Sequence, residues 1–302
     1  DMVEIEIEEE VNEETQAVEE DVSGEPYAEK NGLKRTVYSE EPLVFTIDNY
    51  LTDEECDHFI ELGKNNLQRA FVSDNNTGMI SGGRTGSNHW VDHHRDKITS
   101  RIGEKIAKEI GHPLENSEKY QIIHYGKTQE YRRHFDSWEH DYSEKSMRCM
   151  ILGGARILTA LCYLNDVEEG GGTSFPRLDV TVKAKKGRMV CFENTYRGTH
   201  NKHPLSEHSG DPVIKGEKFA FNLWFRECPR NMLYKDFNPE YYKRGEPIIR
   251  KRIEDKLRRE NNGWSSKSTK SSKEYPLIVN YSLKDTISKE AEYIDKPVYN
   301  LR

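Results

Sequence analysis

The stretch Tyr131-Arg132-Arg133-His134-Phe135-Asp136 contains a histidine and an aspartate two residues apart. If this stretch is a strand, side chains at that spacing point to the same face of a sheet, so an imidazole nitrogen and a carboxylate oxygen converge. Such a pair is typical of two adjacent metal ligands, and a second histidine would complete the 2-His-1-carboxylate set of non-haem Fe(II) sites. A surface strand with a His–Asp hydrogen bond has the same pattern, so the rest of the chain must supply the third ligand.

The segments around this stretch predict two helices followed by many short strands. Thr52-Asp53-Glu54-Glu55 is a capping box that opens a helix to about Leu67, and isoleucines at every fourth position mark a second helix over 96–110. Strands are expected at 43–48, 120–125, 131–136, 156–165, 180–182, 188–193 and 217–226. This order indicates a mainly β fold, a barrel or double-sheet jelly roll packed on N-terminal helices.

The expected strand 217–226 places a lysine inside the barrel. Phe219, Phe221, Leu223 and Phe225 share one face and predict a core packed on the helices, whereas Lys218 and Trp224 lie on the other face. A buried lysine is strongly disfavoured unless it pairs with an anion, so we expect a bound carboxylate or phosphate. His208 precedes Lys218 by ten residues, and the Gly and Pro residues between them predict a turn that returns the chain to the same end of the barrel.

The charges of this 302-residue chain divide it into three parts. Residues 1–25 hold twelve Asp or Glu and no Lys or Arg, which predicts an acidic, mobile leader over residues 1–30. Residues 31–228 are expected to form the folded domain, and residues 229–302 a charged C-terminal extension. The net charge is −8 and the middle of the chain carries no strongly basic region, so we expect no nucleic-acid partner.

The five cysteines predict a reducing compartment. Their number is odd and no C-x-x-C occurs, which argues against a disulfide framework. We find no signal peptide and no apolar run near 18 residues, so we expect a soluble, cytoplasmic protein without a membrane partner.

Motifs in a fixed order give the chain a family resemblance. They are Tyr125-Gly126, Tyr131-x-x-His134-x-Asp136, Arg156-x-x-Thr159 with Tyr163-Leu164-Asn165-Asp166, Gly170-Gly171-x-Thr173-x-Phe175-Pro176, His208-x-Gly210-x-Pro212-Val213, Gly216-Glu217-Lys218 and Trp224. Over about residues 42–228 the chain resembles the prolyl 4-hydroxylases, within the Fe(II)/2-oxoglutarate-dependent dioxygenases. The resemblance implies a double-stranded β-helix, the cupin-like jelly-roll barrel.

The resemblance also implies roles for individual residues. His134, Asp136 and His208 are the implied iron ligands, and Lys218 is the implied partner of the distal carboxylate of 2-oxoglutarate. The further residues implied to contact 2-oxoglutarate or line its pocket are Tyr125, Thr159, Tyr163 and Thr173. Those implied to contact the peptide around the target proline are Tyr131, Arg156 and Trp224. The loop from Ser73 to His89 resembles a lid over the peptide.

The implied reaction is the 4-hydroxylation of peptidyl proline, as in procollagen-proline 4-dioxygenases, with O2 consumed, succinate and CO2 released and ascorbate as reductant. Alternatives are hydroxylation of another residue or of a free amino acid, and a non-catalytic barrel that binds a peptide. Some residues also remain open: His200 and His203 compete with His208 as third ligand, and Tyr163 is compatible with plain barrel core. Arg156 differs in parity from Thr159 and is compatible with a surface position.

Overall fold

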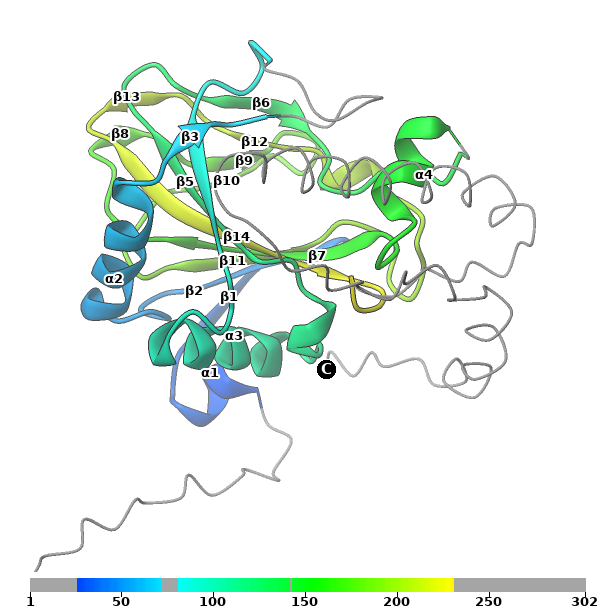
Figure 1. Ribbon diagram of the computed structural model, residues 1–302, viewed down its shortest axis with the longest axis horizontal. Coiled ribbons are helices and arrows are strands. Elements are labelled where there is room, and N and C mark those ends of the chain that lie inside the picture. Colours follow the sequence, from blue (N-terminus) through cyan, green and yellow to red (C-terminus); the bar gives the residue numbers. More distant parts are fainter. Residues whose placement is uncertain (1–25, 72–80, 142, 231–302) are drawn as a thin grey trace, which may run out of the picture.

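The computed structural model describes residues 26–71, 81–141 and 143–230 (Figure 1). The expected acidic leader therefore lies outside the described residues except at its end, where α1 (Tyr27–Lys30) buries Ala28 completely. The C-terminal extension beyond residue 230 and the part of the 73–89 loop up to residue 80 also lie outside them.

An eight-stranded sheet forms the larger layer of the fold. Its strands run in the order β1-β2-β11-β7-β14-β5-β4-β3. They are β1 (Arg35–Glu40), β2 (Leu43–Ile47), β3 (Gln68–Arg69), β4 (Ser87–Val91), β5 (Tyr120–Tyr125), β7 (Arg156–Tyr163), β11 (Met189–Glu193) and β14 (Lys218–Arg226).

Helices pack on one face of this sheet (Figure 1). The capping box at Thr52 opens α2 (Asp53–Lys64), as the sequence predicts, and Asp96 caps α3 (Lys97–Ile110). Phe59 of α2 and the isoleucines of α3 join Phe221, Leu223 and other strand residues in one buried cluster. The remaining helical elements are η1 (Leu114–Asn116), α4 (Glu144–Met150) and η2 (Pro204–Ser206).

The other face of the large sheet is covered by a four-stranded sheet with the order β10-β9-β12-β6 (Figure 1). Its strands are β6 (Tyr131–His134), β9 (Thr173–Phe175), β10 (Val180–Val182) and β12 (His208–Gly210). A two-stranded ribbon adds β8 (Glu169–Gly170) and β13 (Val213–Lys215). Tyr125, Tyr163, Phe175 and Ala220 pack together between the layers.

The expected jelly roll with a helical support layer is confirmed. Phe219, Phe221, Leu223 and Phe225 lie in the helix-side cluster, as the alternation along 217–226 predicts. The sequence predicted neither β1 nor α4. Within the described ranges no helix is long and apolar enough to cross a membrane.

Candidate metal centre and substrate cleft

Two strands of the small sheet bring the candidate metal ligands together. His208 on β12 lies opposite His134 on β6, and a register shift in this pair gives β6 one extra residue before Tyr131 meets Gly210. This register shift is a β-bulge, which changes the direction of the side chains next to it in β6. The rings of Tyr131 and His134 stack with their centroids 3.5 Å apart. Asp136 lies in a bend beyond the end of β6, so its approach to His134 depends on that bend and not on strand alternation.

The donor atoms of His134, Asp136 and His208 fit a metal ion. All three lie within 4.8 Å of one another. Nε2 of His134 is 3.6 Å from Oδ1 of Asp136, and Nε2 of His208 is 3.6 Å from Oδ2. The Nδ1 atoms lie against the carbonyl oxygens of Arg132 and Ser206 at 2.8 and 2.9 Å, so Nδ1–H donates and Nε2 is left for the metal. Two imidazoles and one carboxylate on one side leave positions open for co-substrate, the pattern of non-haem Fe(II) oxygenases.

Asp136 is held by further donors. Thr159 Oγ1 and Trp224 Nε1 both donate to its Oδ2, at 2.7 and 2.8 Å, and Asn194 Nδ2 donates to Thr159 Oγ1 at 2.8 Å. Although burial opposes ionisation, His208 and His134 hold the pKa of Asp136 well below its usual range. Burial, with His134 beside it, lowers the pKa of His208 to about 4. Both shifts favour the forms that bind a cation, a carboxylate and a neutral imidazole.

Lys218 occupies the interior of the barrel, as its strand predicted. It is 2% exposed, and its Nζ donates a weak hydrogen bond to the Gly172 carbonyl at 3.4 Å. Its Nζ lies 5.1 Å and 5.9 Å from the ring centroids of Tyr163 and Tyr125. Burial lowers the pKa of Lys218 to about 8, although nearby Asp211 opposes the shift. An ammonium group so enclosed fits the carboxylate of a small dicarboxylic acid.

The other residues expected at 2-oxoglutarate lie in two places. Tyr163 Oη and Thr173 Oγ1 are 2.6 Å apart, beside Lys218, and burial raises the pKa of Tyr163. Thr159 instead lies at Asp136, four residues along β7. The structure thus brings Tyr125, Tyr163 and Thr173 to the lysine, and Thr159 to the candidate metal ligand.

A cleft of about 570 Å³ opens beside the candidate ligands; His134 and Asp136 line it and His208 lies outside its lining. Tyr131, Arg156 and Trp224, the residues expected to contact a peptide, all line it. Trp90 of β4, 41% exposed, extends the aromatic wall, because its ring lies 5.9 Å from that of Trp224. The cleft is therefore open to solvent and partly aromatic, as a peptide site requires.

A β-bulge decides the position of Arg156. Phe225 pairs with Leu158 but Arg226 pairs with Arg156, so Ile157 is the extra residue and the parity of β7 reverses there. Arg156 therefore reaches the cleft. The alternative prediction, that Arg156 lies on the surface because its parity differs from that of Thr159, is wrong. Its side chain is 16% exposed. Its guanidinium carbon lies 3.8 Å from the centroid of the Trp224 ring.

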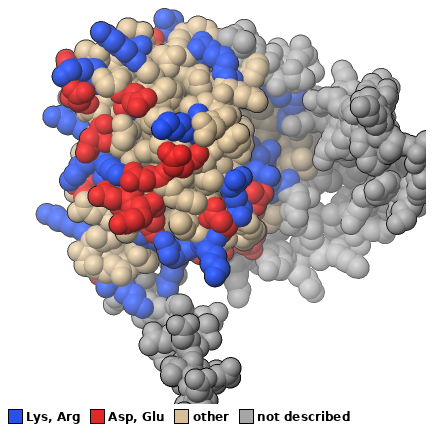
Figure 2. Space-filling view, turned by 60° about the vertical axis from the view of Figure 1, so that its left-hand side comes forward, with Lys and Arg blue, Asp and Glu red and all other residues tan. Residues whose placement is uncertain are grey.

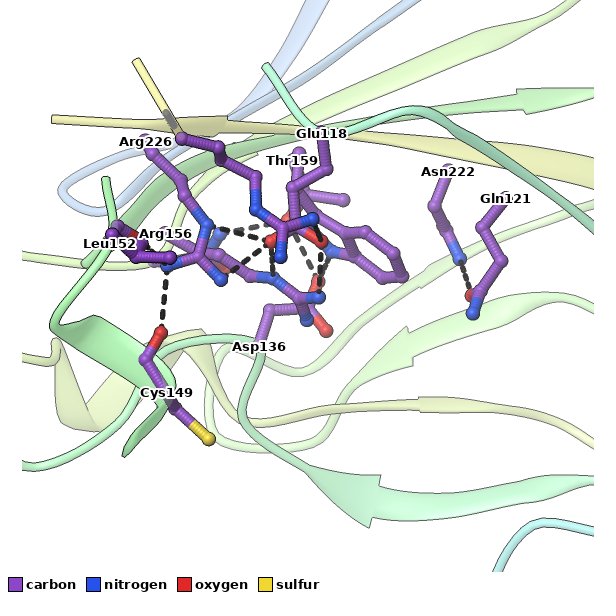
Figure 3. A network of polar contacts seen from close by, with 12 residues as sticks. Glu118, Gln121, Asp136, Cys149, Leu152, Arg156, Thr159, Asn222 and Arg226 are labelled. Atoms are coloured by element: carbon purple, nitrogen blue, oxygen red, sulfur yellow. Dashed lines mark hydrogen bonds and ion pairs between the residues drawn. The ribbon is translucent and has the colours of Figure 1, made fainter. Parts of the chain in front are cut away.

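Glu118 anchors a buried network of charges below the cleft (Figure 3). Arg156 donates to it from Nε and Nη2 at 2.6 and 2.9 Å, and Arg226 donates from Nε at 2.8 Å. Arg226 Nη1 also donates to the carbonyls of Cys149, Leu152 and Gly154. Burial raises the pKa of Glu118, but Arg156 and Arg226 outweigh it and hold that pKa well below its usual range.

The sequence did not identify Glu118, Asn194 or Arg226 as part of the site. Arg226 shares the inward face of its strand with Lys218, so the same argument that a buried cation needs an anion applied to it. Glu118 and Asn194 carry no such pattern, because each lies beside β5 or β11 rather than within it.

The competing histidines lie away from the ligand cluster. His203 Nδ1 accepts a hydrogen bond from the backbone N–H of Leu205 and caps η2. His200 Nδ1 is 4.0 Å from Oε1 of Glu227. Among the described residues, the group that could hold a metal contains His208 with His134 and Asp136, and it contains neither His200 nor His203.

Comparisons with known proteins point to one family. The profile of the 2OG-Fe(II) oxygenase superfamily matches residues 120–226. Prolyl 4-hydroxylase 2 of Arabidopsis thaliana is 36% identical over 217 residues, which cover 64% of this chain and 70% of that protein. Probable prolyl 4-hydroxylase 7 of the same plant is 36% identical over 204 residues, 61% of this chain and 62% of that protein. The chain thus spans less than two thirds of the latter's length.

A solved structure supports the same relation. The viral collagen prolyl hydroxylase of Paramecium Bursaria Chlorella virus-1, in a complex with 2OG, superposes with a TM-score of 0.50 at 27% sequence identity. The match covers 61% of this chain and 95% of the viral one.

Proposed function

The chain belongs to the prolyl 4-hydroxylase family of 2OG-Fe(II) oxygenases, and from this premise we propose that it hydroxylates prolyl residues of a peptide or protein at carbon 4. The family that the motifs predicted is confirmed, with Fe(II) and 2-oxoglutarate as its cofactors. The observation that carries the proposal is the meeting of His134, Asp136 and His208 beside a solvent-open cleft, with Lys218 buried in the barrel interior.

Each group of residues has a distinct part in the proposal. His134, Asp136 and His208 hold Fe(II) through two Nε2 atoms and a carboxylate oxygen. Lys218 pairs with the distal carboxylate of 2-oxoglutarate, and Tyr125, Tyr163 and Thr173 donate to the co-substrate from their hydroxyl groups. This part of the proposal is supported by the Tyr125 and Tyr163 rings near Lys218 Nζ and by the contact between Tyr163 and Thr173. Thr159 and Trp224 orient Asp136.

The cleft binds the peptide. The ring faces of Tyr131 and Trp224 offer flat apolar surfaces of the kind on which a proline ring packs. Arg156 uses Nε and Nη2 for Glu118, whereas Nη1 donates no hydrogen bond to the described residues, so it can donate to a peptide carbonyl. These contacts would keep the target carbon beside the metal and exclude water from it.

The cofactors supply the reaction's oxidising power. Bound Fe(II) and 2-oxoglutarate would activate O2 and couple decarboxylation of the co-substrate to hydroxylation, with succinate and CO2 released. The protein contributes ligands, orientation and a dry interior, because its own side chains are not oxidants of this strength. Ascorbate would keep the iron ferrous.

The cysteines favour a reducing compartment. Cys56, Cys162 and Cys191 are free and buried, and Cys149 is free and partly buried. We propose that the protein works with all five thiols reduced, as in the cytoplasm. Titration of thiols in the denatured, freshly isolated protein tests this, and fewer than five reactive groups would contradict it.

Mass spectrometry of proline-containing peptides incubated with Fe(II), ascorbate and 2-oxoglutarate tests the function. We expect a gain of one oxygen on proline, stoichiometric with succinate. His208→Ala should abolish both products and His200→Ala, outside the ligand cluster, should retain them. Retained iron-dependent turnover in His208→Ala would remove His208 from the site.

Two alternatives give different results in the same assay. Oxygen located on a residue other than proline, or on a free amino acid, would support a different hydroxylase. A non-catalytic barrel would bind the peptide but form no succinate, neither with hydroxylation nor uncoupled from it.

A further inference from the structure

The lining of the cleft is basic although the protein is acidic. The cations that line it are Arg84, Arg132, Arg133, Lys145, Arg156 and Lys202. The acids that line it are Asp136, Glu139 and Asp141. Six cations minus three acids leave an excess of +3, whereas the whole chain has a net charge of −8. The face in Figure 2 differs, because acidic side chains run through its middle with basic ones among and around them.

Half of these cations have a carboxylate partner. Arg156 is paired with Glu118, Arg132 Nε lies 2.9 Å from Oε1 of Glu130, and Lys202 contacts Glu139. Arg84, Arg133 and Lys145 form no ion pair with any described residue. The positive charge of the cleft is therefore concentrated on these three.

Arg84 is a buried cation whose partners are neutral. It is 5% exposed, and it donates to the side-chain oxygen of Gln121 at 2.9 Å and to the carbonyl of Phe71 at 3.3 Å. Its guanidinium lies over the Tyr131 ring, 4.7 Å from the centroid, and its Nε has no hydrogen-bond partner. A charge buried in this way is costly until an anion approaches it.

Arg133 is exposed and lies next to the candidate ligand His134. It lines the cleft and also a smaller pocket that Asp179 and Asp211 line, and its side chain has no hydrogen bond or ion pair with the described residues. The segment that carries Arg84 bridges β6 at Tyr131, and the backbone N–H of Arg132 donates to the carbonyl of Gly83. Arg84 and Arg133 are thus both neighbours of the stacked Tyr131 and His134 rings, within reach of a peptide that crosses the metal site.

We propose that this cleft selects peptides in which an acidic residue lies close to the target proline, with Arg84 and Arg133 binding its carboxylate. An extended peptide rises about 3.3 Å per residue, so the acidic residue would lie within about two positions of the proline. A cleft with a net positive charge, in a protein with a net negative charge, also concentrates ligands that carry negative charge. The inference rests on the proposed function for the proline, but the charge preference concerns binding alone.

Fluorescence anisotropy with labelled peptides tests the preference. Three twelve-residue peptides share one central proline and differ two positions away, where they carry Glu, Gln or Lys. With Mn(II) and 2-oxoglutarate present, we expect the Glu peptide to bind about tenfold more tightly than the Gln peptide at low salt, and the Lys peptide most weakly. The ratio should fall as salt rises, because Arg133 is exposed.

Variants locate the preference. Arg133→Gln should reduce the ratio between the Glu and Gln peptides at least threefold. Arg101→Gln is the matched control, because Arg101 is an exposed arginine of α3 whose partner is Glu55, outside the cleft. Arg84→Lys keeps the buried charge and removes the planar donors, so it should weaken binding of the Glu peptide more than of the Gln peptide.

The outcomes separate the two proposals. Equal dissociation constants for the Glu and Gln peptides, or a ratio that Arg133→Gln leaves unchanged, would overturn the charge preference. If the Gln and Glu peptides are then hydroxylated equally, the proposed function stands without the charge preference. Selective binding of the Glu peptide without any hydroxylation would support the preference and contradict the hydroxylase.

Discussion

Replacement of Glu118 by glutamine should weaken metal binding at a site that Glu118 does not touch. Glu118 clamps Arg156, whose guanidinium lies on the Trp224 ring, and the Trp224 indole N–H donates to Asp136. Figure 3 shows the side chains of Glu118, Arg156 and Asp136 converging from separate elements. Loss of the carboxylate frees the arginine to leave the indole, so Trp224, one of the two donors that orient Asp136 Oδ2, loses its support.

The structure sets the size of both expected effects. The Glu118 side chain is 3% exposed and that of Arg226 is 4% exposed, so the glutamine variant leaves a buried arginine without its anion. Breaking a buried pair in this way costs about 3–5 kcal/mol of unfolding free energy, a fall in Tm of about 6–20 °C for a domain of this size. Loss of a group that orients a metal ligand typically lowers metal affinity by about 10–100-fold.

Calorimetric titration with Co(II) at a temperature well below Tm measures the loss of metal affinity separately from the loss of stability. Glu109→Gln is the matched control, because the Glu109 side chain is fully buried and pairs with Arg35, away from the cleft. It should lose comparable stability and keep its Co(II) affinity. The reasoning is refuted if folded Glu118→Gln binds Co(II) like the unaltered protein, or if Glu109→Gln loses affinity equally.

Further changes test the inner pocket and its supports. Because burial lowers the pKa of Lys218 to about 8, the dissociation constant of 2-oxoglutarate should be constant below pH 8 and rise about tenfold per pH unit above it. The variant Lys218→Arg keeps its positive charge above pH 8 and should remove this rise. A rise that persists in Lys218→Arg would exclude Lys218 as its source. The same depressed pKa implies that the unfolded chain binds more protons between pH 8 and 10.5, so Lys218 makes stability rise across that interval; denaturant titrations of the protein and of Lys218→Met should differ in slope there. Thr159→Val removes a donor to Asp136 and should lower Co(II) affinity several-fold with little change in Tm, an expectation that unchanged affinity would contradict. Gly86→Ala would place a Cβ 2.5 Å from the Tyr125 ring, so we expect about 1–3 kcal/mol of destabilisation and weaker 2-oxoglutarate binding, measured by thermal denaturation with and without 2-oxoglutarate.

Local pattern was enough to predict the elements that carry the site. The alternation along 217–226 separates the helix-side core from the face of Lys218, and burial of that lysine follows from strand geometry alone. The capping box at Thr52 and the isoleucine repeat after Asp96 likewise predict α2 and α3, because a cap and a helical period are local signals. The motifs around His134 and His208 added the family and its cofactors.

What the sequence by itself determined about this protein is its period-two strands, its capped helices and a buried lysine that requires an anion. The tertiary structure alone decided what depends on register. The bulge at Ile157 turns Arg156 into the cleft, and the shift between β6 and β12 stacks Tyr131 on His134. Pairing between strands distant in sequence also brings Glu118 to Arg226 and Asn194 to Thr159. A single residue of register reverses every side chain beyond it, and no local pattern in either strand specifies where such a shift occurs.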